Sequence, residues 1–334
     1  MLVRDVTRRR GDRAPRFNGS TEGEINENNG AFKKEDCGCA VKTARSFIFA
    51  QEWVFDKMNK PTFLCIGAQK AGTSWLYQVL REHKEIWLGP FKEYQYFNSL
   101  FVKQHTAWTR WHIKVSAERA VRQYITQPNK IDFTYLSYLT QIANEQLMFT
   151  EDWYSHIFSR GGLAVKGDVT PEYCTIPQEG IDYVLRLLGA VPIIYLIRDP
   201  LDRALSQLKM NVSRKGIVQP STESEWEPIV NDWDINNRGD YKTNVTNWLA
   251  RYPNDRLLFI PYRDIASDPI KVLRQVESHV GVSENAAYSK ADARIFEGEK
   301  IDLPRFVVDM MQDRVNSQYE FLKTEFGDEF LSRV

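Results

Sequence analysis

The chain has 334 residues, 43% of them hydrophobic and 13% aromatic, which is enough to bury the core of a globular enzyme. Its 44 basic and 44 acidic side chains give a formal net charge of zero. A dedicated nucleic-acid or polyanion binder would show a strong basic excess, so we expect no nucleic-acid partner. A basic cleft, if present, must be built from a few residues.

The first 45 residues are polar and show no periodic apolar pattern. Such a segment cannot offset its own ordering entropy, so residues 1–45 are predicted to be a disordered tail before a single domain over 46–334. Residues 45–58 are predicted to form a helix that leads into that domain. No signal-peptide apolar region and no apolar run near 18 residues is present, which predicts no membrane span and a cytoplasmic location.

The segment from Phe63 to Leu80 is the most informative part of the sequence. Its apolar run Phe63–Ile66, followed by Gly67, predicts a strand buried on both faces, and Thr73 or Ser74 opens a helical pattern. A glycine-containing turn between a strand and a helix directs unpaired backbone N–H groups and the helix dipole at one point. This arrangement predicts an anion site.

The turn departs from the ATP-binding P-loop in one place. In that loop a lysine follows the second glycine and reaches the β and γ phosphates. Here Thr73 holds that position and Lys70 lies inside the loop, where it would face the group bonded to a single 5′-phosphate. The pattern favours transfer of an anion beside one phosphate; a plain strand–turn–helix with chance glycines is the alternative.

A second strand–helix junction follows at Val191–Ile197, an apolar run that ends in Arg198. Asp199 is a good N-cap, so the next helix is predicted to begin directly after it. Ser206 lies two turns into that helix, where a guanidinium group and a hydroxyl can meet one phosphate. The alternative is a structural ion pair between Arg198 and Asp199 or Asp202.

Together the two segments resemble the sulfotransferases that use 3′-phosphoadenosine 5′-phosphosulfate (PAPS). In that family the first loop holds the 5′-phosphosulfate and the second junction holds the 3′-phosphate. The resemblance implies that PAPS, and its product PAP, bind to Lys70, Ala71, Gly72, Thr73, Ser74 and Trp75 in the first segment and to Arg198 and Ser206 in the second.

Further motifs extend the resemblance over roughly residues 60 to 325. Lys92–Phe97 looks like the Lys-Glu-x-x-Phe-Phe signature of glycosaminoglycan and related carbohydrate sulfotransferases, and Thr170–Tyr173 continues the likeness. Residues 289–302 lie where the family has a loop closing over the nucleotide; we expect a basic contact from Arg294 or Lys300, with Lys290 as a third candidate. Heparan-type enzymes carry a lysine where this chain has Val169, so the resemblance does not identify the acceptor.

The family also suggests roles in the reaction. Lys70 would stabilise the charge that builds on the oxygen leaving with the 5′-phosphate, and Glu93, beside Lys92, would be the general base. His156 is the first alternative base, with His83, His105 and His112 behind it. The transferred group carries little charge, so a lysine and helix N–H groups can replace the magnesium of kinases, and no metal is expected.

Short apolar strands at 63–66, 191–197 and 257–261 alternate with helices at 181–189, 268–279 and 304–325. This alternation predicts a three-layer, P-loop-like α/β fold with a central parallel sheet and helices on both faces. Ligands of such sheets bind beyond the carboxyl ends of the strands, so one cleft can hold both phosphates. The four cysteines are predicted to be free thiols, too isolated for a zinc site.

The sequence therefore predicts a transferase that moves a sulfuryl group from PAPS to a hydroxyl of a carbohydrate or small metabolite. Two alternatives come from other classes. One is a P-loop nucleotide kinase or NTPase, which Thr73 in place of the P-loop lysine disfavours. The other is a binding protein of the same fold that has lost catalysis.

Overall fold

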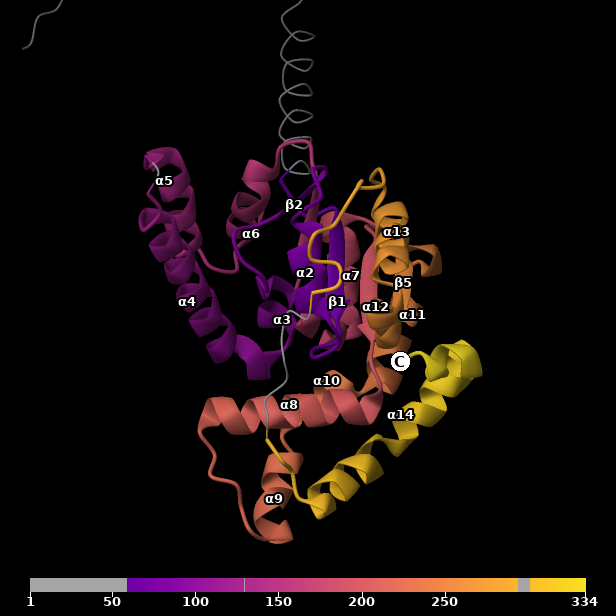
Figure 1. The fold of residues 1–334 in the computed structure, drawn as a ribbon. Coiled ribbons are helices and arrows are strands. Elements are labelled where there is room, and N and C mark those ends of the chain that lie inside the picture. Colours follow the sequence, from indigo (N-terminus) through magenta and orange to yellow (C-terminus); the bar gives the residue numbers. More distant parts are fainter. Residues whose placement is uncertain (1–58, 129, 294–300) are drawn as a thin grey trace, which may run out of the picture. The chain divides into compact units, whose positions relative to one another are not determined.

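The computed structural model describes residues 59–128, 130–293 and 301–334 (Figure 1). The predicted tail, the helix expected at 45–58, the domain boundary between them, and the predicted contacts Arg294 and Lys300 lie outside the described residues.

The described residues form one parallel sheet of five strands, in the order β2-β3-β1-β4-β5. The strands are β1 (Phe63–Gly67), β2 (Ile86–Leu88), β3 (Val165–Val169), β4 (Ile193–Ile197) and β5 (Leu257–Pro261). Every neighbouring pair is parallel. The predicted α/β fold with a central parallel sheet is confirmed.

Helices alternate with these strands along the chain and pack around the sheet (Figure 1). The predicted helices at 181–189, 268–279 and 304–325 correspond to α7 (Gln178–Leu188), α13 (Pro269–Val280) and α14 (Arg305–Ser332). The others described are α2 (Thr73–Leu80), α3 (Tyr96–Phe101), α4 (Thr106–Ile125), α5 (Phe133–Ile142), α6 (Glu151–Phe158), α8 (Pro200–Lys215), α9 (Glu223–Val230), α10 (Trp233–Gly239), α11 (Tyr241–Arg251) and α12 (Tyr262–Ser267).

Strands β1 and β4 lie side by side in the middle of the sheet and are buried along their whole length. A strand covered on both faces must be apolar throughout, which is why these two were visible in the sequence as unbroken apolar runs. Because parallel strands end at the same edge, the loops that follow β1 and β4 begin next to each other.

Two apolar clusters hold the described residues together. The larger surrounds the sheet. The smaller lies between α8, α9, α10 and α14, with Leu208, Trp226, Ile235 and Met311 almost fully buried. Burial of each such side chain stabilises the fold by about 1.5–3 kcal/mol. The smaller cluster fixes α8, which follows directly from β4 and crosses below the sheet in Figure 1.

Cys65 and Cys174 are buried free thiols, as predicted, and the other two cysteines lie outside the described residues. Among the residues described, no helix combines the length and the apolar character needed to cross a membrane. The cytoplasmic location stays a prediction.

Candidate active site

A large open cleft of about 1570 Å³ lies at the carboxyl edge of the sheet. Its walls come from the loop after β1, the first turn of α2, Lys92 and Glu93, one face of α4, and residues from α8 and α12. Seven basic and three acidic side chains are among the described residues that line it: Lys70, Lys92, Arg119, Arg198, Arg214, Lys215 and Arg238, against Glu93, Asp234 and Asp292.

The loop between β1 and α2 presents the helix N-terminus to this cleft. Gly72 is the N-cap residue of α2 and has φ 95°. Because glycine has no side chain, no N-cap oxygen accepts a hydrogen bond from the first backbone N–H groups of the helix. A Cβ added at Gly72 would lie 2.9 Å from Ile265 Cδ1, the end of a side chain that can move, so it is the left-handed backbone that favours glycine here. Lys70 is also left-handed, with φ 70°, and its Nζ lies 3.9 Å from Met210 Sδ on α8.

Arg198, at the end of β4, is joined directly to that loop. Its Nη1 donates a hydrogen bond of 2.9 Å to the carbonyl oxygen of Lys70, across 128 residues of sequence. Its guanidinium carbon lies 4.7 Å from the ring centre of Tyr262, and the predicted alternative ion pair with Asp202 is present only at 4.0 Å. Ser206 lines the same cleft. The structure thus brings the two sequence motifs together.

The helix start after Arg198 follows the local pattern that the sequence showed. The Asp199 side chain accepts a hydrogen bond from the backbone N–H of Asp202, and Pro200 occupies the first helical position. Tyr241 holds the strand end, because its hydroxyl accepts from the Arg198 N–H and donates to the Arg198 carbonyl. The guanidinium group therefore starts from a fixed backbone.

Lys92 connects the loop with Glu93. Its Nζ donates to Thr73 Oγ1 and Ser74 Oγ, both at 3.1 Å, and to Glu93 Oε1 at 2.7 Å. The Glu93 N–H donates to the carbonyl oxygen of Val169 at 3.2 Å, and its φ of 69° is unusual for a residue with a side chain. Strained conformations of this kind concentrate at functional sites.

The Glu93 carboxyl is subject to opposing effects. Burial raises its pKa, but the cations Lys92 and Arg238 and the imidazole of His112 lower it further than burial raises it, so the net pKa lies below the ordinary value. Glu93 is therefore ionised at neutral pH and available as a proton acceptor.

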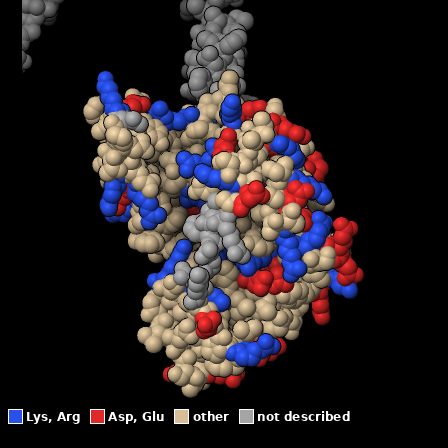
Figure 2. Space-filling view, in the orientation of Figure 1, with Lys and Arg blue, Asp and Glu red and all other residues tan. Residues whose placement is uncertain are grey.

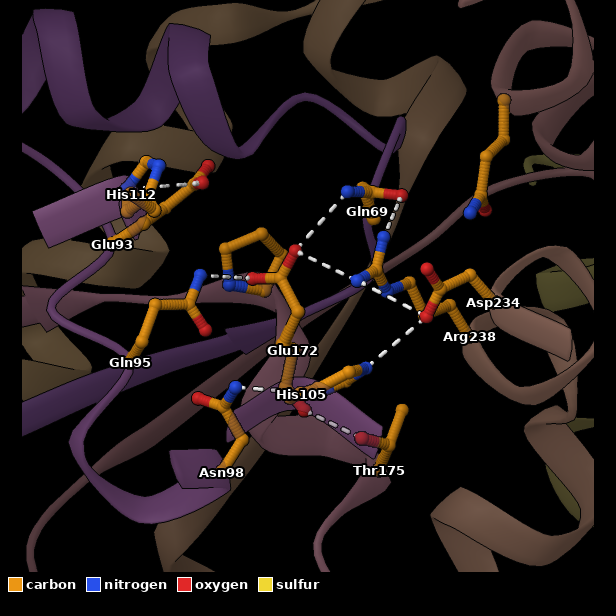
Figure 3. A network of polar contacts seen from close by, with 12 residues as sticks. Gln69, Glu93, Gln95, Asn98, His105, His112, Glu172, Thr175, Asp234 and Arg238 are labelled. Carbon is orange, nitrogen blue, oxygen red and sulfur yellow. Dashed lines mark hydrogen bonds and ion pairs between the residues drawn. The ribbon is translucent and has the colours of Figure 1, made fainter. Parts of the chain in front are cut away.

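His112, on α4, is the histidine that shares the cleft with Glu93 (Figure 3). Its Nε2 lies 3.9 Å from Glu93 Oε2, and its ring stacks on Trp108 with ring centres 5.2 Å apart. The Nε2 atom is buried and has no hydrogen-bond partner among the described residues. The 3.9 Å between His112 Nε2 and Glu93 Oε2 leaves room for one hydroxyl oxygen that is hydrogen-bonded to both side chains.

The predicted alternative base His156 is not among the residues that line the cleft. Its Nε2 lies 3.2 Å from the Tyr138 carbonyl oxygen. His83 Nε2 likewise lies 2.9 Å from the Ser283 carbonyl oxygen. Sequence position alone could not separate these histidines, because α4 reaches the cleft only through the tertiary fold.

A buried polar network supports the loop from behind (Figure 3). The carboxylate of Glu172, which is fully buried, accepts hydrogen bonds from Gln69 at 3.1 Å and Gln95 at 2.9 Å. Arg238 donates to Gln69 Oε1 at 3.0 Å and forms ion pairs with Asp234 at 3.3 Å and Glu172 at 3.8 Å. The network fixes Gln69, the residue before Lys70. Gln69 and Arg238 were not predicted from the sequence; the glutamate of the Thr-Pro-Glu-Tyr stretch was the signal available there.

Replacing Arg238 with methionine is expected to lower the free energy of unfolding by about 2 kcal/mol. The change leaves the Glu172 carboxylate without its cation, although the two glutamine bonds remain, so the loss falls below the roughly 3–5 kcal/mol of a fully stranded buried charge. Urea unfolding measures it. The double variant Arg238→Met/Glu172→Gln should recover part of the loss, and a double variant no more stable than Arg238→Met would contradict the pairing.

Two predicted nucleotide contacts occupy different settings. Trp75 lines the cleft, and its indole N–H donates to the Ala291 carbonyl oxygen at 2.8 Å. The Ala71 side chain is fully buried and is not part of the lining, so that residue has only its backbone to offer.

Val169, at the position where the heparan-type pattern has lysine, is 2% exposed. Its neighbour Asp168 is fully buried and accepts hydrogen bonds from the hydroxyls of Tyr154, Thr170 and Tyr173. Burial raises the pKa of Asp168 to about 6, against the lowering effect of those bonds. Both residues lie in β3 and are part of the buried core of the sheet.

An uncapped helix N-terminus follows the buried strand β1, and its loop is joined to an arginine at the end of β4, the neighbouring strand of the sheet. In a parallel α/β fold this arrangement is suited to an anion. Residues 61–285 match the family model described as "Sulfotransferase family". The match covers more than half of the chain, and the chain belongs to the sulfotransferase family.

Individual relatives are distant. The chain is 24% identical to the mouse (Mus musculus) bifunctional heparan sulfate N-deacetylase/N-sulfotransferase 4, over 73% of this chain and 24% of that protein. It is 26% identical to mouse heparan sulfate glucosamine 3-O-sulfotransferase 3B1, over 39% of this chain and 35% of that protein. The chain thus spans about a quarter to a third of these relatives.

Among solved structures, a sulfotransferase from Alicyclobacillus acidocaldarius aligns with a TM-score of 0.52 and 18% sequence identity, covering 82% of this chain and 97% of that one. At this identity the likeness supports the fold.

Proposed function

We propose that this protein transfers a sulfuryl group from PAPS to a hydroxyl of a carbohydrate or small-metabolite acceptor and releases PAP. The observation that carries the proposal is the hydrogen bond from Arg198 to the Lys70 carbonyl, within a cleft that both residues line. It supports a nucleotide whose 3′-phosphate would contact Arg198 and whose 5′-phosphosulfate would contact the loop that contains Lys70. Membership of the sulfotransferase family supports it.

The residues present fit a nucleotide with phosphates at both positions. The first turn of α2 has no side-chain cap, and the buried Arg198 Nε has no hydrogen-bond partner among the described residues. Unsatisfied buried donors of this kind are expected where an anionic ligand completes the site. The Thr73, Ser74 and Lys92 side chains add donors beside the helix N-terminus.

The proposed chemistry is an in-line transfer. Glu93, ionised and facing the cleft, takes the proton of the acceptor hydroxyl while the hydroxyl oxygen bonds to sulfur. The bond between sulfur and the oxygen of the 5′-phosphate breaks as PAP leaves, and Lys70 stabilises the negative charge that builds on that oxygen. Lys92 holds Glu93 at a fixed distance from Thr73 and Ser74, and so aligns the base with the phosphosulfate loop.

The two alternatives are less well supported. A kinase or NTPase would need a lysine where Thr73 stands, and the matching family model is that of sulfotransferases. A binding protein without catalysis would have no need for Lys70 and Glu93 in the same cleft. We propose that the reaction needs no metal, because lysine and helix N–H groups supply the positive charge.

Nucleotide selectivity tests the proposal most directly. PAP is expected to bind much more tightly than AMP, because each charged hydrogen bond to the 3′-phosphate contributes about 1.5–3 kcal/mol. Arg198→Ala should remove most of that difference, a loss of roughly tenfold to a hundredfold in PAP affinity. Calorimetry with PAP, AMP and ATP measures it.

Arg186→Ala on α7, outside the cleft lining, is the matched control and should keep the selectivity. Equal affinity of the unmodified protein for PAP and AMP would rule out the PAPS assignment. Preferential binding of ATP would favour the kinase alternative.

A further inference from the structure

One face of α4 forms a wall of the cleft. Trp108, Trp111, Val115 and Arg119 recur every three to four residues and all line the cleft, so they lie along one side of the helix. They extend over roughly 16 Å at 1.5 Å per residue. We call these four residues the acceptor face.

The two tryptophans of this face differ in how they are held. Trp108 is stacked with His112, and the Arg238 guanidinium lies 5.7 Å from its ring centre. Trp111 is 60% exposed and stacks on no aromatic ring of the described residues. A large exposed aromatic side chain in a cleft is a binding surface for the apolar face of a ring.

The charge of the cleft differs from that of the whole chain. Basic and acidic side chains are interspersed over the face shown in Figure 2, and the chain is neutral overall, yet basic residues outnumber acidic ones in the cleft lining. Lys215 is compensated by an ion pair with Asp232 at 2.9 Å. Arg119 and Arg214 form no ion pair with any described residue. Two uncompensated guanidinium groups favour an anionic ligand.

These two arginines lie beyond the residues proposed to hold the nucleotide. Arg214 follows Ser206 by eight residues, roughly 12 Å along α8. Arg119 stands on α4, two turns beyond His112, whose Nε2 lies 3.9 Å from the proposed base Glu93. The acceptor face therefore starts beside the base and leads away from the phosphosulfate loop.

We propose that the acceptor face binds an acceptor with two features, a ring that stacks on Trp111 and an anionic group of its own that pairs with Arg119. This inference rests on the proposed function, since it assigns the second substrate of the same cleft. An anionic sugar and an anionic phenol share the required chemistry.

The experiment uses two matched pairs of probes, added to the full-length protein saturated with PAP. Methyl β-glucuronide is compared with methyl β-glucoside, and 4-hydroxyphenylpropionate with its methyl ester. Affinities are measured by titration and ligand-observed NMR. In at least one pair the anion should bind roughly five- to tenfold more tightly than its neutral partner, and that pair identifies the ring as sugar or phenol. The preference should shrink at high salt.

Variants assign the preference to residues. Arg119→Gln should abolish most of the anion preference, while Arg122→Gln, three residues on along α4 and outside the lining, should keep it. Trp111→Ala should weaken both members of the preferred pair, whereas Phe133→Ala, 76% exposed and outside the cleft, should weaken neither.

Three results would overturn the inference in a protein that binds PAP: no binding by either anion, equal affinities within both pairs, or an anion preference that survives Arg119→Gln. Failure of PAP itself to bind would contradict the proposed function instead. The PAP titration is therefore done first, and the two failures remain distinguishable.

Discussion

Lys70→Ala is expected to lower kcat by a factor on the order of 10² to 10³, as for the loss of one donor that acts on transition-state charge. Lys70 lies in the loop between β1 and α2 with a left-handed backbone and lines the cleft. Its charge contributes most when the leaving oxygen becomes negative, so PAP affinity should fall much less than turnover. Initial rates of PAP formation from PAPS, beside PAP calorimetry, measure the two effects.

Lys209→Ala is the matched control, since Lys209 is on α8 next to Met210 but does not line the cleft. It should leave kcat unchanged. A Lys70→Ala variant that keeps nearly full turnover would assign the stabilising role to another group, and a proportional loss of PAP affinity would make Lys70 a binding residue.

Glu93→Gln is expected to lower turnover on an alcohol acceptor by roughly 10² to 10⁴ with PAP affinity unchanged, because glutamine keeps the size of the side chain but cannot take a proton. With an acidic phenol, whose proton leaves easily, the loss should be smaller. Rates on one alcohol and one phenol decide the point: an equally small effect on both would remove Glu93 as the base.

The two histidines provide the comparison. His112→Asn alters the group 3.9 Å from Glu93, whereas His156→Asn alters a ring outside the cleft lining. If Glu93 is not the base, His112→Asn should show the large loss instead. His156→Asn should leave kcat unchanged. A large loss of kcat in that variant would show that the base is not among the residues that line the cleft.

The pH dependence separates the same candidates. Glu93 acts when deprotonated, and its neighbours hold its pKa below the ordinary value, so activity should persist as the pH falls through the range where glutamate usually titrates. The acid limb of the kcat/KM profile should therefore lie below about pH 4.5. The profile is measured only at pH values where the protein remains folded. An acid limb between about pH 6 and 7 would indicate an imidazole base.

The local parts of the site could be predicted because neighbouring residues determine them. The apolar run of β1, the glycine before α2, and the Asp199-Pro200 start of α8 are each set by adjacent side chains, hydrogen bonds and backbone preferences. The parallel sheet followed from the alternation of strands with helices. Strands β2 and β3 escaped prediction because one has three residues and the other includes Lys166 and Asp168.

The sequence by itself determined a strand–loop–helix of the kind that can bind an anion, a second junction bearing an arginine, and the parallel α/β architecture that puts both at one edge. Only the tertiary structure decided which side chains complete the cleft: that His112 and not His156 faces Glu93, that Arg238 supports Gln69 from α10, and that Trp111 and Arg119 form a wall. The physical reason is range. Capping and strand burial depend on residues within a few positions, whereas these contacts join segments far apart in sequence, and their pairing depends on how the helices pack around the sheet.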